Sequence, residues 1–104
     1  MSGKAFFKDL TSNIVLLDTK EKNCNFRFVI EAKEDYGRID IDLIVDNCFA
    51  YTIKCKINFD EKPTLEITAI QKVKDATKKA IKIANNVIAE VRETFDDIMH
   101  IYEG

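Results

Sequence analysis

Apolar and polar residues alternate through the middle of the chain. Four runs share this period of two: Cys24–Ala32, Ile39–Val45, Phe49–Phe59 and Leu65–Ala69. A period of two places apolar side chains on one face of a strand and polar side chains on the other. One wet face is typical of antiparallel sheets, so the pattern predicts an antiparallel sheet with one covered face.

The segments between these runs are short and polar. They are Lys33–Arg38, Asp46–Cys48 and Asp60–Thr64. Gly37 lies in the first of them, where we expect it to supply a positive φ. Connections of this length join neighbouring antiparallel strands, so the simplest topology is a meander.

Opposite charges give each hairpin an expected register. Oppositely charged side chains that face each other across a ladder stabilise it, and apolar side chains pair with apolar ones. The pairs predicted on this basis are Ile30–Ile39, Arg27–Asp42, Glu31–Arg38, Val45–Phe49, Asp40–Lys54, Phe59–Leu65 and Ile57–Ile67.

The period changes to that of a helix after residue 70. Apolar residues at spacings of three and four predict one long helix over residues 71–103. A helix of about 33 residues is ~50 Å long. The longest predicted strand, 49–59, reaches only about 36 Å, so part of the helix should overhang the sheet unless the helix bends near Asn85-Asn86.

The first residues predict smaller elements. Ser2 can cap a short helix through Lys4–Leu10, and Ile14–Leu17 reads as a further short strand. The expected fold is therefore a single α+β domain over residues 1–104. An antiparallel meander of four to five strands (about 14–70) has one face covered by the long C-terminal helix (about 71–103).

Charge along the predicted helix runs against the helix dipole. Residues 71–84 hold five lysines and one aspartate, whereas residues 85–104 hold five acids and one arginine. A dipole favours acids at the start of a helix and bases at its end. An antiparallel copy, centred near residues 85–86, would bring Lys78 near Glu93 and Lys74 near Asp97. The predicted oligomer interface comprises Lys74, Lys78, Ala80, Ala84, Val87, Val91, Glu93, Asp97 and Ile98.

Composition narrows the class of protein. The chain has 104 residues and a net charge of −2, which is too close to neutral to indicate general affinity for nucleic acid. No apolar run approaches the roughly 18 residues of a membrane span. The three cysteines, Cys24, Cys48 and Cys55, have no CxxC spacing, their number is odd, and no secretion signal is evident. We therefore expect reduced thiols and a cytoplasmic location.

Two acidic motifs resemble those of enzymes. Asp40-Ile-Asp42 resembles the paired-carboxylate strand of nucleotidyltransferases, but the Gly-Ser turn of that superfamily does not precede it. Asp18, with Glu31 and Lys33, resembles the spaced Asp…Glu-x-Lys of a nuclease family, whose mixed α/β core differs from a meander. We interpret these residues as acids and bases of a solvated surface.

No other pattern points to catalysis. His100 is the only histidine, so one chain cannot form a histidine pair or a His/Cys metal cluster. The sequence has no glycine-rich phosphate loop. The prediction is therefore a non-enzyme without catalytic, cofactor or metal residues.

A small interaction protein is the function that this sequence favours. We expect homo-oligomerisation and contacts with another protein, as in a phage or mobile-element inhibitor or accessory factor. A sheet followed by a long helix also resembles SecB-type export chaperones in outline, which implies a holdase as one alternative. A nucleic-acid-binding accessory subunit is another alternative. However, the alternation places the aromatic residues of the strands on the apolar face of the sheet, where they could not stack with bases: Phe26, Phe28, Phe49, Tyr51 and Phe59.

Overall fold

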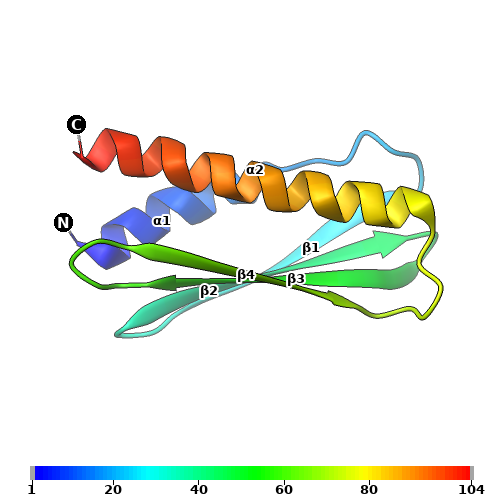
Figure 1. The fold of residues 1–104 in the computed structure, drawn as a ribbon, viewed down its shortest axis with the longest axis horizontal. Helices are drawn as coiled ribbons and strands as arrows, with labels where there is room; N and C mark the ends of the chain where they lie inside the picture. The colour runs from blue at the N-terminus through cyan, green and yellow to red at the C-terminus, as the bar shows by residue number, and fades with distance from the viewer. Residues whose placement is uncertain (1, 104) are drawn as a thin grey trace.

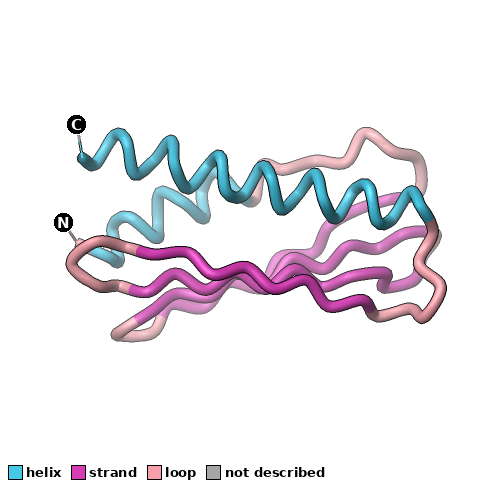
Figure 2. Tube along the Cα trace, viewed as in Figure 1, coloured by secondary structure: helices cyan, strands magenta, loops and turns pink. Residues whose placement is uncertain are grey.

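The computed structural model describes residues 2–103, and its elements form two layers. All four strands lie in one antiparallel sheet with the order β1-β2-β3-β4, and both helices cover the same face of it (Figures 1 and 2). The predicted α+β meander with a long C-terminal helix is confirmed. The elements are α1 (Gly3–Ile14), β1 (Cys24–Ala32), β2 (Tyr36–Val45), β3 (Cys48–Asn58), β4 (Thr64–Gln71) and α2 (Lys78–Glu103).

The first hairpin has the register that its charges predicted. Ile30 lies opposite Ile39, and the pairs Arg27–Asp42 and Glu31–Arg38 are formed as expected. The third hairpin is shifted by two residues from the prediction, because Leu65 pairs with Ile57 and not with Phe59. A shift of two keeps every side chain on its expected face.

The second hairpin contains a β-bulge that the sequence pattern did not reveal. Asp46 and Asn47 both have positive φ, 50° and 65°, as in a two-residue type I′ turn. This turn closes with Val45 opposite Cys48, so the predicted Val45–Phe49 pair is wrong, whereas Asp40–Lys54 is confirmed.

The bulge falls at Ala50 and reverses the face of the residue before it. Phe49 pairs with Ile44, and Tyr51 pairs with Leu43, so one extra residue separates the two pairs. Phe49 therefore lies on the open face of the sheet with 44% of its surface exposed. Its predicted place on the apolar face is wrong.

The core lies between the covered face of the sheet and the two helices. Buried side chains from the central strands meet buried side chains from both helices there. The largest of these fully buried side chains are Phe6, Leu10, Ile14, Ile39, Ile41, Leu43, Ile53, Ile57 and Val91.

α1 is longer than the predicted Lys4–Leu10 helix. The Ser2 hydroxyl accepts a hydrogen bond from the Ala5 N–H at 3.4 Å and caps its first turn. The apolar spacing continues to Ile14, which is fully buried as the last helical residue. The strand predicted at Ile14–Leu17 is therefore wrong, because the helical period extends four residues further.

Gly37 is needed for close packing and not for a turn. It lies within β2, and no glycine among residues 2–103 has a positive φ, so the expected conformation is wrong. A Cβ at this position would overlap the ring of Phe7 from α1. The missing side chain thus lets α1 approach the sheet closely.

α2 starts later than predicted. β4 extends to Gln71, and Thr77 caps the helix, because its hydroxyl accepts a hydrogen bond from the Ala80 N–H at 3.2 Å. The resulting 26 residues span ~39 Å, close to the reach of β3, so the predicted overhang is wrong. Within residues 2–103, no helix has the length and apolar composition required to cross a membrane.

Candidate interaction surfaces

The residues predicted to form an oligomer interface fall into two groups in the structure. Five of them are buried against the chain's own sheet and α1, namely Ala80, Ala84, Val87, Val91 and Ile98. The chain itself therefore covers the side chains that were expected to meet a second copy. Lys78, Glu93 and Asp97 are exposed on α2, whereas Lys74 lies in the link between β4 and α2. The predicted pairing of Lys74 with Asp97 assumed a helical Lys74, and that assumption is wrong.

Another part of α2 remains uncovered, on the side that adjoins β4. Arg92 adjoins Leu65 of β4 on this side, and Ile81, which lies about three turns earlier on the same face of α2, is 43% exposed. Val73 of the link that precedes α2 is 39% exposed. Ile70 is 37% exposed, but it pairs with Thr52 and therefore lies on the open face of the sheet. We call this surface the β4 flank and define it by the apolar residues of β4, the link and α2 on this side: Leu65, Ile67, Ala69, Val73, Ile81 and Ile88.

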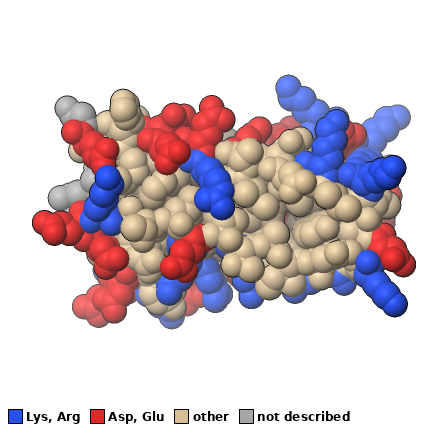
Figure 3. Space-filling view, in the orientation of Figure 1, with Lys and Arg blue, Asp and Glu red and all other residues tan. Residues whose placement is uncertain are grey.

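Charge surrounds the β4 flank but does not cover its middle. Figure 3 shows an area of mostly uncharged surface between α2 and β4, with basic side chains at one end of α2 and acidic side chains at the other. β4 itself carries only one charged residue, Glu66. The low number of charged residues on β4 could have identified the flank from the sequence. The flank was not predicted, because the helix was expected to start at residue 71 and not at Lys78.

The open face of the sheet carries a polar network. The Thr52 hydroxyl donates to Asp42 Oδ1 at 2.7 Å, and Arg27 Nη2 lies 3.1 Å from Asp42 Oδ2. The same guanidinium lies over the ring of Phe49, 5.0 Å from its centroid. Asp42 is thus a buried carboxylate held by two donors, which is a structural arrangement.

Asp40 adjoins this network but is bound less completely. Its Oδ2 lies 3.6 Å from Arg38 Nε, and its Oδ1 is the one buried side-chain oxygen of the described chain without a hydrogen-bond partner. Lys54 lies opposite it on β3. No group of three metal-ligating side chains occurs in residues 2–103. Cations therefore lie beside both carboxylates, but Asp42 is buried, so the expectation that it belongs to a solvated surface is wrong.

The nuclease-like residues are not brought together. Asp18 lines a pocket beside α2, whereas Glu31 lies on β1 between Lys33 Nζ at 2.6 Å and Arg38 Nη2 at 3.2 Å. Hydrogen bonding and charge from Lys33 lower the pKa of Glu31, and Glu31 in turn raises the pKa of Lys33. A lysine with a raised pKa is a poor proton acceptor, so this pair serves as a surface ion pair.

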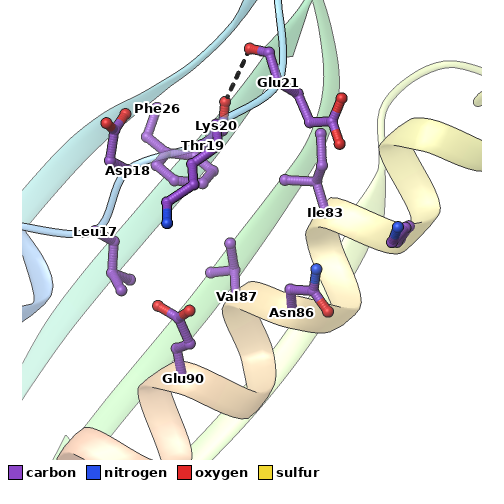
Figure 4. Close-up of a pocket in the computed structure, with 11 residues that line it drawn as sticks. Leu17, Asp18, Thr19, Lys20, Glu21, Phe26, Ile83, Asn86, Val87 and Glu90 are labelled. Atoms are coloured by element: carbon purple, nitrogen blue, oxygen red, sulfur yellow. Dashed lines mark hydrogen bonds between the residues drawn. The ribbon is translucent and has the colours of Figure 1, made fainter.

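The pocket beside α2 has a volume of about 310 Å³. Figure 4 shows Ile83, Val87 and Glu90 of α2 directed toward the loop that carries Leu17 and Thr19. Thr19 Oγ1 donates to backbone oxygens of the same segment, 3.4 Å from Glu21 O and 3.2 Å from Cys24 O. These bonds hold the loop, and both signs of charge line the pocket, so its chemistry selects no particular ligand.

The thiols and the histidine lie apart. Burial raises the pKa of the Cys55 thiol to about 12, which makes it inert at neutral pH. Cys24 is half-buried and Cys48 is exposed at the start of β3. His100 is exposed in the last turns of α2, so no nucleophile and base are adjacent among these residues.

Comparison with known proteins gives no relative. No family model matches the chain, and no curated protein and no solved structure matches it significantly.

Proposed function

We propose that the protein is a small non-enzymatic interaction protein that acts as a homo-oligomer, with the β4 flank as its self-association surface. The observation that carries this proposal is the mostly uncharged surface between α2 and β4 (Figure 3), on the side of α2 where Ile81 is 43% exposed. Apolar patches with charged rims are typical of protein–protein contacts.

The side chains that could have supported catalysis also favour a binding role. Asp42 is held by Arg27 and Thr52, and Glu31 is held by Lys33. A carboxylate that already has cationic and hydroxyl partners is less available to a metal ion or a proton. This arrangement supports a non-enzyme.

Within that class, we propose a cytoplasmic inhibitor or accessory factor of a phage or mobile element that binds another protein. The free thiols Cys24, Cys48 and Cys55 support a reducing compartment. The open sheet face, with both signs of charge beside Phe49, offers a second surface for that protein. A SecB-like holdase receives less support, because α2 already covers the apolar face of the sheet.

Binding of single-stranded nucleic acid is a second candidate, and one observation favours it. The bulge at Ala50 places Phe49 on the open face, and Lys56 Nζ lies over the Tyr36 ring at 4.9 Å on the same face. Exposed aromatic rings beside cations can stack with bases. Retention on single-stranded DNA that falls with salt, and that Phe49→Ala abolishes, would support this candidate; salt-independent retention would contradict it.

The main proposal is tested by solution mass. Light scattering at about 50 µM should give at least twice the monomer mass for the native chain. Ile81→Ser should shift that mass toward the monomer, because Ile81 lies on the β4 flank. Ile101→Ser is the matched control, since Ile101 is a more exposed isoleucine of the same helix on another side. A monomeric native chain, or equal effects of the two variants, would contradict the proposal.

A further inference from the structure

The outer edge of β4 presents unpaired backbone groups. The Lys72 N–H donates to Ala50 O at 2.8 Å, so the backbone groups of Lys72 point toward β3. Hydrogen bonding alternates along an antiparallel ladder, so every second residue of β4 directs its backbone N–H and C=O groups away from β3. These residues are Leu65, Ile67, Ala69 and Gln71. In residues 2–103 no strand lies beside that edge. Such an edge is a template for another strand.

We propose that β4 pairs antiparallel with β4 of a second copy about a two-fold axis at Thr68, which joins the two sheets into one of eight strands. This inference rests on the proposed self-association and gives it a geometry. The axis pairs Ile67 with Ala69 of the other copy, and Leu65 with its Gln71, so that outward backbone groups meet.

Charge on β4 favours this register. An axis at Glu66 would place two like charges opposite each other, which destabilises a ladder. An axis at Thr68 places Glu66 opposite Ile70 of the second copy and diagonally beside its Lys72. Thr68 then faces Thr68, a small polar pair that suits the exposed open face.

The helices fit the same axis. α2 packs over β2, β3 and β4 on the covered face (Figure 1). A helix centred over β3 would be about three strand spacings, or ~14 Å, from its symmetry mate. That separation exceeds the roughly 8–10 Å of directly packed helices, so the two helices do not clash, and long side chains would bridge them. Ile81 and Ile88 would then line the groove between the two helices.

The ionic ends of α2 become complementary in this arrangement. Leu65 adjoins Phe95 and Arg92 at the lower end of β4. Three residues along β4 cover about 10 Å, or about seven helical residues, so the axis crosses α2 near Val87. Lys78 of one copy then lies opposite Asp96 of the other. Opposite charges at both ends select the antiparallel orientation.

A single introduced cysteine tests the register. Thr68 would face its own mate as a non-hydrogen-bonded pair, with Cα atoms about 4.5 Å apart, within the span of a disulfide. In a Cys48→Ser background, Thr68→Cys should form a covalent dimer on mild oxidation. Val29→Cys, on the open face of β1, is the matched control and should not. An oligomer in which the two variants cross-link equally would overturn the register but leave the proposed function intact.

A proline tests the edge itself. Ala69→Pro removes an N–H that points outward and should raise the dissociation constant of the dimer about tenfold or more. Ile30→Pro is the matched control on β1. The Lys33 N–H donates to Tyr36 O at 2.8 Å, so by alternation the Ile30 N–H also points away from the sheet. Ile30→Pro should leave the dissociation constant of the dimer unchanged. Loss of the dimer in Ile30→Pro but not in Ala69→Pro would overturn the proposal.

Charge reversal tests the arrangement without altering the strand. Lys78→Glu and Asp96→Lys should each weaken the dimer several-fold at low salt, and the double variant should restore it. A double variant that is no tighter than either single variant would overturn the helix pairing. A native chain that is monomeric in sedimentation would overturn the proposed function together with this geometry.

Discussion

The two edges of the sheet differ in what surrounds them. β1 exposes Val29 and Ile30, just as β4 exposes Ile70, so apolar exposure alone does not distinguish them. On β1, however, Arg27 and Glu31 form ion pairs on the open face. The loop before β1 is also fastened to α2, because Lys79 Nζ donates to Lys22 O at 2.8 Å.

β4 has the second form of protection but not the first. The loop before it is joined to α2 by the ion pair between Lys62 Nζ and Glu103 Oε1 at 3.2 Å. The strand itself carries one charge, Glu66, and Ile81 is exposed on the side of α2 that adjoins it. Natural sheets commonly blunt an exposed edge with charge or cover it with another segment. The difference indicates that charge on the strand blunts the β1 edge, whereas the β4 edge suits an external strand.

The largest expected effect concerns α1, which closes the β1 side. Phe6 is fully buried, and its ring lies 5.2 Å from the Phe95 ring and 5.6 Å from the Tyr102 ring. Phe6→Ala should therefore lower the free energy of unfolding by about 3–5 kcal/mol. Urea denaturation measures this, with Ile101→Ala as an exposed control that should stay within ~0.5 kcal/mol. Similar losses in both variants would mean that α1 does not close the core.

A smaller loss of stability is expected from a threonine substitution in the interior of the open face, and almost none from the same substitution on the β4 edge. Thr52→Val removes the hydroxyl that donates to Asp42 Oδ1 and leaves a buried carboxylate short of one donor. The free energy of unfolding should fall by about 1–2 kcal/mol. Thr68→Val makes the same chemical change on exposed β4 and should change it by less than ~0.5 kcal/mol. The two values come from the same denaturation experiment, and the reverse order would contradict the assigned network.

Most of the sheet could be predicted because period two and charge pairing act locally. Arg27–Asp42 and Asp40–Lys54 each follow from neighbouring strands joined by short turns. The bulge at Ala50 could not be predicted in this way. Alternation from Phe49 to Phe59 is unbroken in the sequence, and the extra residue is imposed by the backbone of the Asp46–Asn47 turn.

The ends of the helices were less predictable because strand and helix compete there. Gln71 continues β4 through the pairing with Tyr51, which is a contact distant in sequence. The predicted oligomer interface depended on where the helix begins, because a helix that starts at residue 71 would overhang the sheet. Starting at Lys78, it buries its main apolar stripe and leaves Ile81 of the β4 flank and Ile101 exposed.

The smallest expected effect concerns the ion pairs that protect β1. Lys33 lowers the pKa of Glu31 below its ordinary value of 4.5, chiefly through their hydrogen bond. The stabilisation from this pair is therefore present above pH 4.5 and is lost as the pH falls through the lowered pKa. On the other side, Glu31 raises the pKa of Lys33 above 10.5, so the same stabilisation is lost as the pH rises through that value.

NMR titration of the Glu31 carboxyl carbon measures the effect directly. Lys33→Gln should return the pKa of Glu31 toward its ordinary value, and the remaining Arg38, 3.2 Å away, should keep it slightly lower. Glu31→Gln should leave the solution mass unchanged, because the charges of β1 protect an edge that takes no part in the proposed dimer. A larger oligomer in Glu31→Gln would mean that charge alone prevents β1 from pairing with another chain. The attachment of the loop before β1 to α2 would then contribute little to that protection.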